Sequence, residues 1–154
     1  MLAVGEEAPG FTLENHAGEP VSLAHFAGRP VVVYFYPRAD TPGCTTEACG
    51  FRDAWADFEA AGTAVLGISD DPVADLAAFR ERYDLPFALL SDPDGAVASA
   101  YDAYGEKSMF GRTFDGVFRT TYLVDADGRV AAAYPDVDPD GHAEAVLAEV
   151  ADLA

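Results

Sequence analysis

A buried strand that leads directly into a cysteine-bearing helix constrains this fold more than any other feature of the sequence. The run Val31–Tyr36 is β-branched and aromatic throughout, which is typical of a central strand buried on both faces. Pro37 and Pro42 bracket the turn that follows. From Thr45 onward, apolar residues recur at three- and four-residue spacing. The pattern therefore predicts a strand, a tight turn and a helix that begins near Cys44.

The rest of the chain continues this alternation of strands and helices. The first helix is predicted to end at Gly62. Further strands are predicted at 11–13, 21–23, 64–69, 87–90, 119–124 and 129–134, and further helices at 72–83, 96–101 and 141–153. This order predicts a single α/β domain over residues 1–154, a three-layer sandwich whose central mixed sheet is flanked by helices.

The charge of the chain narrows the range of partners. There are 27 acidic residues against 9 basic ones, a net charge of −18, and Lys107 is the only lysine. Nucleic acids and anionic membranes both attract basic surfaces, so we expect neither as a partner. The N-terminus has no basic start followed by an apolar stretch, and Val31–Tyr36 is far too short to cross a bilayer. We therefore expect a cytoplasmic protein.

The acidity itself has two interpretations. It could belong to a generically acidic protein, or it could be an adaptation to a salt-rich cytoplasm, where screening removes the self-repulsion that such a charge causes. We favour the halophilic interpretation, which predicts that the fold weakens as salt is removed.

The two cysteines are the clearest candidates for chemistry. Only Cys44 and Cys49 are present, too few for the disulfide framework of a small secreted domain. A thiol at a helix N-terminus has its thiolate stabilised by free backbone N–H groups and by the helix dipole. When a thiolate attacks and expels an oxyanion, that leaving group needs hydrogen-bond donors and a cation. Thr41 offers a hydroxyl as a donor, and Gly43 allows close approach of the backbone. The cation, a guanidinium, must come from elsewhere in the chain.

The spacing of the cysteines has a mechanical consequence. Five residues along an α-helix correspond to a rise of ~7.5 Å and Cα atoms roughly 8 to 9 Å apart. A disulfide needs Cα atoms closer than about 7 Å. Cys44 and Cys49 therefore cannot join while the helix is intact, and the first turns must unwind if they do.

Several motifs together resemble a known family. The pattern Pro37-x-x-x-Thr41-x-x-Cys44 resembles the active-site signature of peroxiredoxins, and the segment 34–49 is similar to the bacterioferritin comigratory protein (peroxiredoxin Q) subfamily. The resemblance continues, in order, at residues 5–13, 67–69, 85–92, 104–107, 118–125 and 141–144.

The resemblance implies a thioredoxin-like fold and assigns roles to five residues. Cys44 matches the peroxidatic cysteine and Cys49 the resolving cysteine. Thr41 matches the hydroxyl that binds peroxide and orients the thiolate, and Pro37 matches the residue that shields the site. Arg119 matches the arginine that favours the thiolate and holds the peroxide.

Some alternatives remain open from the residues alone. Cys49 could be a packing residue, which would leave a one-cysteine enzyme, and Arg119 could be a surface arginine on an edge strand.

Glu47 occupies a position that is often acidic in the family, where it can orient arginines. The dispersed histidines His16, His25 and His142 do not form a metal-binding pattern, so we expect no metal.

The resemblance implies reduction of hydrogen peroxide and organic hydroperoxides without a cofactor. It implies a thioredoxin- or glutaredoxin-like reductant and a monomer or homodimer. The competing functions are a thiol–disulfide oxidoreductase and a redox-sensing module on the same fold. An oxidoreductase normally uses a C-x-x-C motif, and the wider spacing of Cys44 and Cys49 disfavours it.

Overall fold

A seven-stranded mixed sheet forms the centre of the molecule, in the strand order β2-β1-β5-β4-β3-β8-β9. The computed structural model describes residues 1–153, without the side chain of Met109. The strands are β1 (Thr12–Asn15), β2 (Pro20–Ser22), β3 (Val31–Phe35), β4 (Ala64–Ser69), β5 (Ala88–Ser91), β8 (Thr120–Val124) and β9 (Val130–Tyr134). Strands β3, β4 and β5 are parallel, and the other neighbouring pairs are antiparallel.

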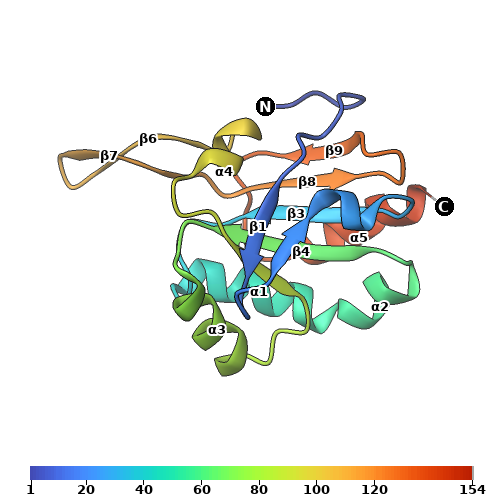
Figure 1. Cartoon of the computed structure of the whole chain (residues 1–154), viewed down its shortest axis with the longest axis horizontal. Coiled ribbons are helices and arrows are strands. Elements are labelled where there is room, and N and C mark those ends of the chain that lie inside the picture. The colour runs from blue at the N-terminus through green and yellow to red at the C-terminus, as the bar shows by residue number, and fades with distance from the viewer. Residues whose placement is uncertain (154) are drawn as a thin grey trace.

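Helices pack on both faces of this sheet (Figure 1). They are α1 (Pro42–Asp53), α2 (Trp55–Ala60), α3 (Val73–Arg82), α4 (Ala96–Ala100) and α5 (His142–Asp152), with a short 3₁₀ helix η1 (Leu23–Phe26). The predicted three-layer sandwich with a central mixed sheet is therefore confirmed. In the described part of the chain, no helix is both long and apolar enough to cross a membrane.

The alternation of side chains along β3 explains why both faces are covered. Every residue of β3 is buried. Val32 and Tyr34 pack with residues of α1, α2, α3 and α5, whereas Val33 and Phe35 pack with the layer that includes α4. Successive side chains of a strand point to opposite faces, so a strand of this composition needs a helical layer on each side.

The first helix differs from its prediction at both ends. It begins at Pro42, because proline suits the first helical turn, where a backbone N–H has no helical partner. It ends at Asp53, where Ala54 leaves the helical conformation (φ −94°, ψ 2°) and separates α1 from α2. The predicted single helix to Gly62 is therefore wrong, although both cysteines lie in one uninterrupted helix.

A two-stranded hairpin, β6 (Tyr104–Met109) and β7 (Arg112–Val117), was not predicted. It forms a separate sheet that projects from the body of the molecule (Figure 1). Residues 112–115 are all exposed, so the outer part of β7 lacks the apolar alternation by which a half-buried strand is recognised.

Candidate active site

Cys44 is the third residue of α1 and is 1 % exposed. The first backbone hydrogen bond of the helix runs from Thr45 N to Thr41 O at 2.8 Å. The amides of Gly43 and Cys44 therefore have no partner in the preceding turn of the helix. Cys44 thus lies in the first turn of a helix, as the sequence predicted, where free amides and the helix dipole are favourable to an anion.

Arg119 supplies the guanidinium that the turn lacks. Its Nη2 lies 3.4 Å from Cys44 Sγ, and its side chain is 18 % exposed. Arg119 directly precedes β8, whose first residue, Thr120, pairs with Phe35 at the end of β3. This antiparallel register brings Arg119 to the same edge of the sheet as the turn that leads into α1. Since β8 lies between β3 and β9, the alternative of an arginine on an edge strand is wrong.

Gly43 leaves the space that the guanidinium occupies. A Cβ atom built on Gly43 would lie 2.9 Å from Arg119 Nη2, closer than such atoms normally approach. From the sequence we expected Gly43 to allow close approach of the backbone, and the structure shows that Arg119 also approaches the first turn of α1 at this glycine.

Glu47 holds Arg119 from the opposite side. Its Oε1 accepts a hydrogen bond from Arg119 Nη1 at 2.9 Å, and the carboxylate is fully buried. Burial raises the pKa of Glu47 to about 7, although Arg119 lowers it. Burial also lowers the pKa of Arg119, but the charges and hydrogen bonds of Cys44 and Glu47 outweigh this effect and raise it. The arginine is thus clamped between a thiol and a carboxylate.

The second oxygen of Glu47 has little support. Among the described residues, Oε2 is buried without a hydrogen-bond partner, and His142 Nε2 lies 4.0 Å from it. His142 Nε2 instead shares a hydrogen bond of 2.9 Å with Thr121 Oγ1. Burial, with a contribution from Arg119, lowers the pKa of His142 to about 4, so the imidazole is neutral at pH 7. Arg119 is therefore the main anchor of Glu47.

The turn before α1 is held by a buried aspartate that the sequence did not single out. Asp71 Oδ2 accepts hydrogen bonds from Ala39 N and Ser69 Oγ, both at 2.7 Å. Pro37 lies half-buried in this turn. In the sequence, Asp71 only precedes the predicted helix 72–83, and no motif marks it as part of the site.

Thr41 lies next to the cysteine-bearing turn of α1, but its hydroxyl has another partner. Oγ1 donates to the carbonyl oxygen of Arg38 at 2.9 Å. Among the described residues, no hydrogen bond joins Thr41 to Cys44. To contact a peroxide, the hydroxyl must accept a hydrogen bond from it or turn away from Arg38. The contact of Thr41 with peroxide stays a prediction.

Cys49 lies on a different side of α1 from Cys44. Both cysteines are free, Cys44 buried and Cys49 half-buried. Cys49 lines a pocket of about 430 Å³, together with Gly50 of α1 and with His142 and Ala143 of α5. The resolving candidate is thus open to a cavity between two helices, whereas the candidate nucleophile is enclosed by Arg119 and its own turn.

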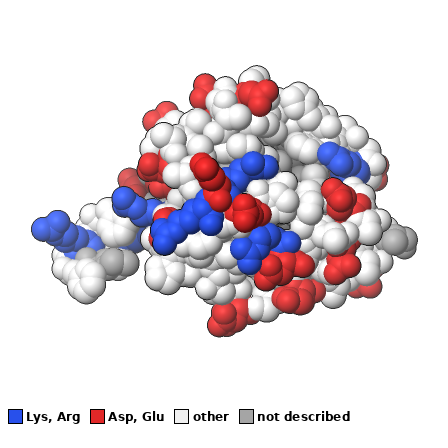
Figure 2. All heavy atoms as spheres, turned by 90° about the horizontal axis from the view of Figure 1, so that it is seen from below, with Lys and Arg blue, Asp and Glu red and all other residues white. Residues whose placement is uncertain are grey.

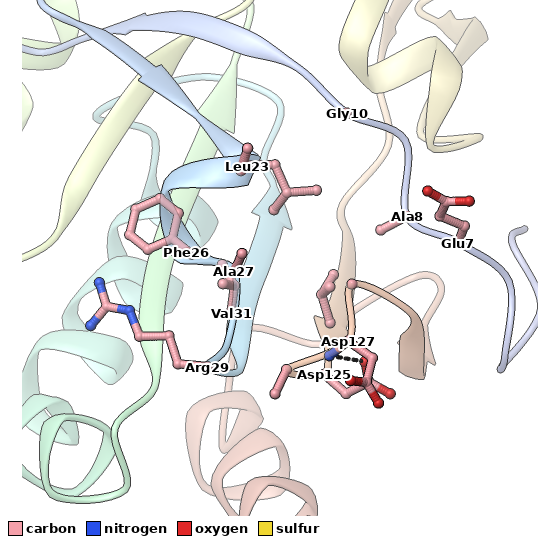
Figure 3. A pocket seen from close by; sticks show the side chains of 14 residues that line it. Glu7, Ala8, Gly10, Leu23, Phe26, Ala27, Arg29, Val31, Asp125 and Asp127 are labelled. Atoms are coloured by element: carbon pink, nitrogen blue, oxygen red, sulfur yellow. Dashed lines mark hydrogen bonds between the residues drawn. The ribbon is translucent and has the colours of Figure 1, made fainter.

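A further pocket of about 250 Å³ lies at the opposite end of the sheet (Figure 3). Val31 and Val124 line it, at the first residue of β3 and the last residue of β8, with Phe26 and Asp125 among their neighbours. No cysteine or histidine lines this pocket. The pocket therefore lies away from Cys44, which follows the other end of β3.

The arrangement around Cys44 is suited to nucleophilic attack by sulfur. The Cys44 thiol lies at a helix start next to a fixed guanidinium, and donors placed in this way can stabilise an oxyanion that leaves during nucleophilic attack. In the described part of the chain, no three His, Cys, Asp or Glu side chains are grouped so that they could hold a metal ion.

Comparisons with known proteins point to one family. The profile of the AhpC/TSA family matches residues 4–133. Peroxiredoxin Bcp of Escherichia coli is 45 % identical over 146 residues, which are 95 % of this chain and 94 % of that protein. Peroxidoxin BcpB of Mycobacterium tuberculosis superposes with a TM-score of 0.90 at 35 % identity, covering 100 % of this chain and 99 % of that one.

A structure described in terms of activity is also similar. The bacterioferritin comigratory protein of Xanthomonas campestris, described as having alkyl peroxide reduction activity, superposes with a TM-score of 0.88 at 37 % identity. The match covers 92 % of this chain and 90 % of that one.

Proposed function

The chain belongs to the AhpC/TSA family as a thiol peroxidase of the peroxiredoxin Bcp/PrxQ type, and we propose that Cys44 is the thiol that attacks the peroxide. The contact between Arg119 Nη2 and Cys44 Sγ at 3.4 Å carries this proposal. It pairs the only buried cysteine with a cation that Glu47 holds in position. We propose that its substrates are hydrogen peroxide and organic hydroperoxides.

In the first step, the Cys44 thiolate forms a bond to the terminal oxygen of ROOH and the O–O bond breaks. The sulfur is oxidised to a sulfenic acid, and the leaving alkoxide takes a proton and departs as ROH. Arg119 and the amides at the start of α1 stabilise the developing negative charge on the leaving oxygen. Thr41 is the candidate hydroxyl that orients the peroxide, and Pro37 limits the access of water.

In the second step, Cys49 resolves the sulfenic acid. Its thiol loses a proton, the sulfur attacks Cys44 Sγ, and water leaves as the disulfide forms. Because both residues lie in the intact helix α1, their Cα atoms are roughly 8 to 9 Å apart, and the first turns of α1 must unwind before the bond can form.

An external dithiol then reduces the disulfide by thiol exchange and is itself oxidised. Family membership implies a thiol reductant, and we propose that it is a thioredoxin- or glutaredoxin-like protein in the cytoplasm. We propose that the chain acts as a monomer or homodimer.

Intact-mass measurement after one equivalent of peroxide tests this proposal. The wild-type chain should lose the mass of two hydrogen atoms, and peptide mapping should locate the disulfide between Cys44 and Cys49. Cys44→Ser should abolish peroxide consumption. Cys49→Ser should complete the first turnover, accumulate the sulfenic acid and stall with thioredoxin. Normal cycling by Cys49→Ser would refute the resolving role, and consumption of peroxide by Cys44→Ser would refute the nucleophile.

A further inference from the structure

Lys107, the only lysine of the chain, forms no ion pair with the residues that the structure describes. It lies on β6 with its side chain half-buried. Among the described residues, no carboxylate lies within salt-bridge distance of its ammonium group. Figure 2 shows Lys and Arg side chains on the projecting hairpin, which carries Lys107 and, nearer its tip, Arg112.

Two glycines that face each other across the hairpin leave space for the Lys107 side chain. Gly105 and Gly116 pair across the hairpin, and Lys107 shares their face because it follows Gly105 by two residues. A Cβ atom on Gly116 would lie 3.2 Å from Lys107 Cδ, and one on Gly105 would lie 3.0 Å from the ring of Phe118. The lysine stem therefore runs through space that larger residues would fill.

The Lys107 side chain extends toward the segment that carries Arg119. The ammonium group lies 5.6 Å from the centroid of the Phe118 ring, and Phe118 directly precedes Arg119. Burial and the charge of Arg119 lower the pKa of Lys107, while Cys44 and Asp70 raise it. Lys107 thus lies against the residue that precedes Arg119, and the charges of both Arg119 and Cys44 influence its pKa.

A second cation here changes which peroxides are attracted. The net charge of −18 repels anions, but at an ionic strength of about 0.15 M a charge acts over only about 8 Å. Within that distance Arg119 is already paired with Cys44 and Glu47, whereas Lys107 has no carboxylate at salt-bridge distance among the described residues and is the cation that can bind an anionic group. Arg119 alone already contacts the sulfur, and a neutral peroxide offers no second charge for Lys107 to bind.

We propose that Lys107 is a specificity residue that binds the negative group of hydroperoxides carrying a carboxylate, so that the enzyme prefers them over neutral hydroperoxides of equal size. This inference rests on the proposed function, because it concerns the substrate of the Cys44 site. Phe118, beside the ammonium group, provides an apolar surface for the carbon skeleton of such a substrate.

The test compares two substrates that differ in one charge. These are cumene hydroperoxide bearing a para carboxylate and the methyl ester of the same compound. The readout is the ratio of their second-order rate constants for oxidation of Cys44, measured by stopped flow. A ratio removes any effect of a substitution on the thiol itself, because both substrates react with the same sulfur.

We expect Lys107→Met to lower the ratio of carboxylate to ester about fivefold, as for the loss of one partly screened charge pair. Lys107→Arg should restore the ratio. Arg112→Met, which removes the same charge further out on the hairpin, should keep the wild-type ratio. Asp70→Asn, which removes an acid that acts on Lys107, should raise it. Potassium chloride at about 1 M should diminish the wild-type preference.

Two results would overturn the inference: an unchanged ratio in Lys107→Met, or an equal fall in Arg112→Met. In both cases continued consumption of the ester would leave the peroxidase function intact. If the wild-type protein consumed neither hydroperoxide, the proposed function and the inference would fail together.

Discussion

Replacement of Glu47 by glutamine should change how the stability of the fold depends on pH. Glu47 is fully buried beside Arg119, and burial raises its pKa from 4.5 to about 7. In the unfolded chain the carboxyl group is solvated and releases its proton near the ordinary value. Between these two values the native state therefore binds more protons than the unfolded state.

The sign and size of the effect follow from this difference. A group whose pKa is raised on folding stabilises the native state fully below the unfolded value, and this contribution is lost as the pH rises through the native value. For Glu47 the loss from about pH 5 to about pH 8 is on the order of 2 to 3 kcal/mol in the free energy of unfolding. Glu47→Gln cannot titrate, so its stability should lack this decline.

Urea unfolding at the two pH values, in the same concentration of KCl, measures the effect. The quantity of interest is the free energy of unfolding of wild type minus that of Glu47→Gln. The contributions of the other acidic residues cancel in this difference. Glu81→Gln is the matched control, because Glu81 is exposed on α3, and its difference should change by less than about 0.5 kcal/mol. If Glu47→Gln retained the full decline of wild type, the buried carboxyl group would not be the one that takes up the proton.

Three further predictions concern the geometry and charge of the same protein. Gly43→Ala should displace Arg119 and so slow the oxidation of Cys44 about tenfold in stopped flow. Gly50→Ala is the control, because its new Cβ atom would meet only Ala143, at 3.7 Å, and it should react at the wild-type rate. Equal rates for the two variants would contradict the close approach of Arg119. Arg119→Ala should slow the same step by about tenfold or more, and an unchanged rate would remove Arg119 from the site. The melting temperature should rise from low to multimolar KCl, and a flat profile would contradict the halophilic interpretation.

The sequence predicts best where one element determines its own surroundings. The run Val31–Tyr36 has no polar side to expose, so its burial in the sheet centre was predictable, and the predicted strand 64–69 has the bounds of β4. The hairpin β6–β7 was missed because its exposed residues follow no apolar period. Local pattern thus revealed the layers but not the projecting hairpin.

The active site shows the same division between local and long-range information. The helix start at Cys44 is a local feature, and proline, glycine and cysteine in one turn revealed it. The contact with Arg119 depends on the register of β8 against β3, which no local pattern encodes; only the resemblance to peroxiredoxins singled it out. His142 and Asp71 had no such signal, because their roles arise from burial beside Thr121 and Ala39, far away in the sequence.

In the proposed cycle, the contacts that activate Cys44 also keep α1 folded. Arg119 joins the sulfur to Glu47, one turn further along the helix, and this clamp opposes the unwinding that the disulfide needs. Oxidation removes the negative charge from the sulfur, because a sulfenic acid is neutral, so the attraction to Arg119 weakens only after peroxide has reacted. Phe51, stacked on Tyr34 with ring centroids 4.8 Å apart, anchors the following turn of α1. Unwinding can therefore begin at Pro42 and extend to Cys49 while the end of the helix stays packed on the sheet.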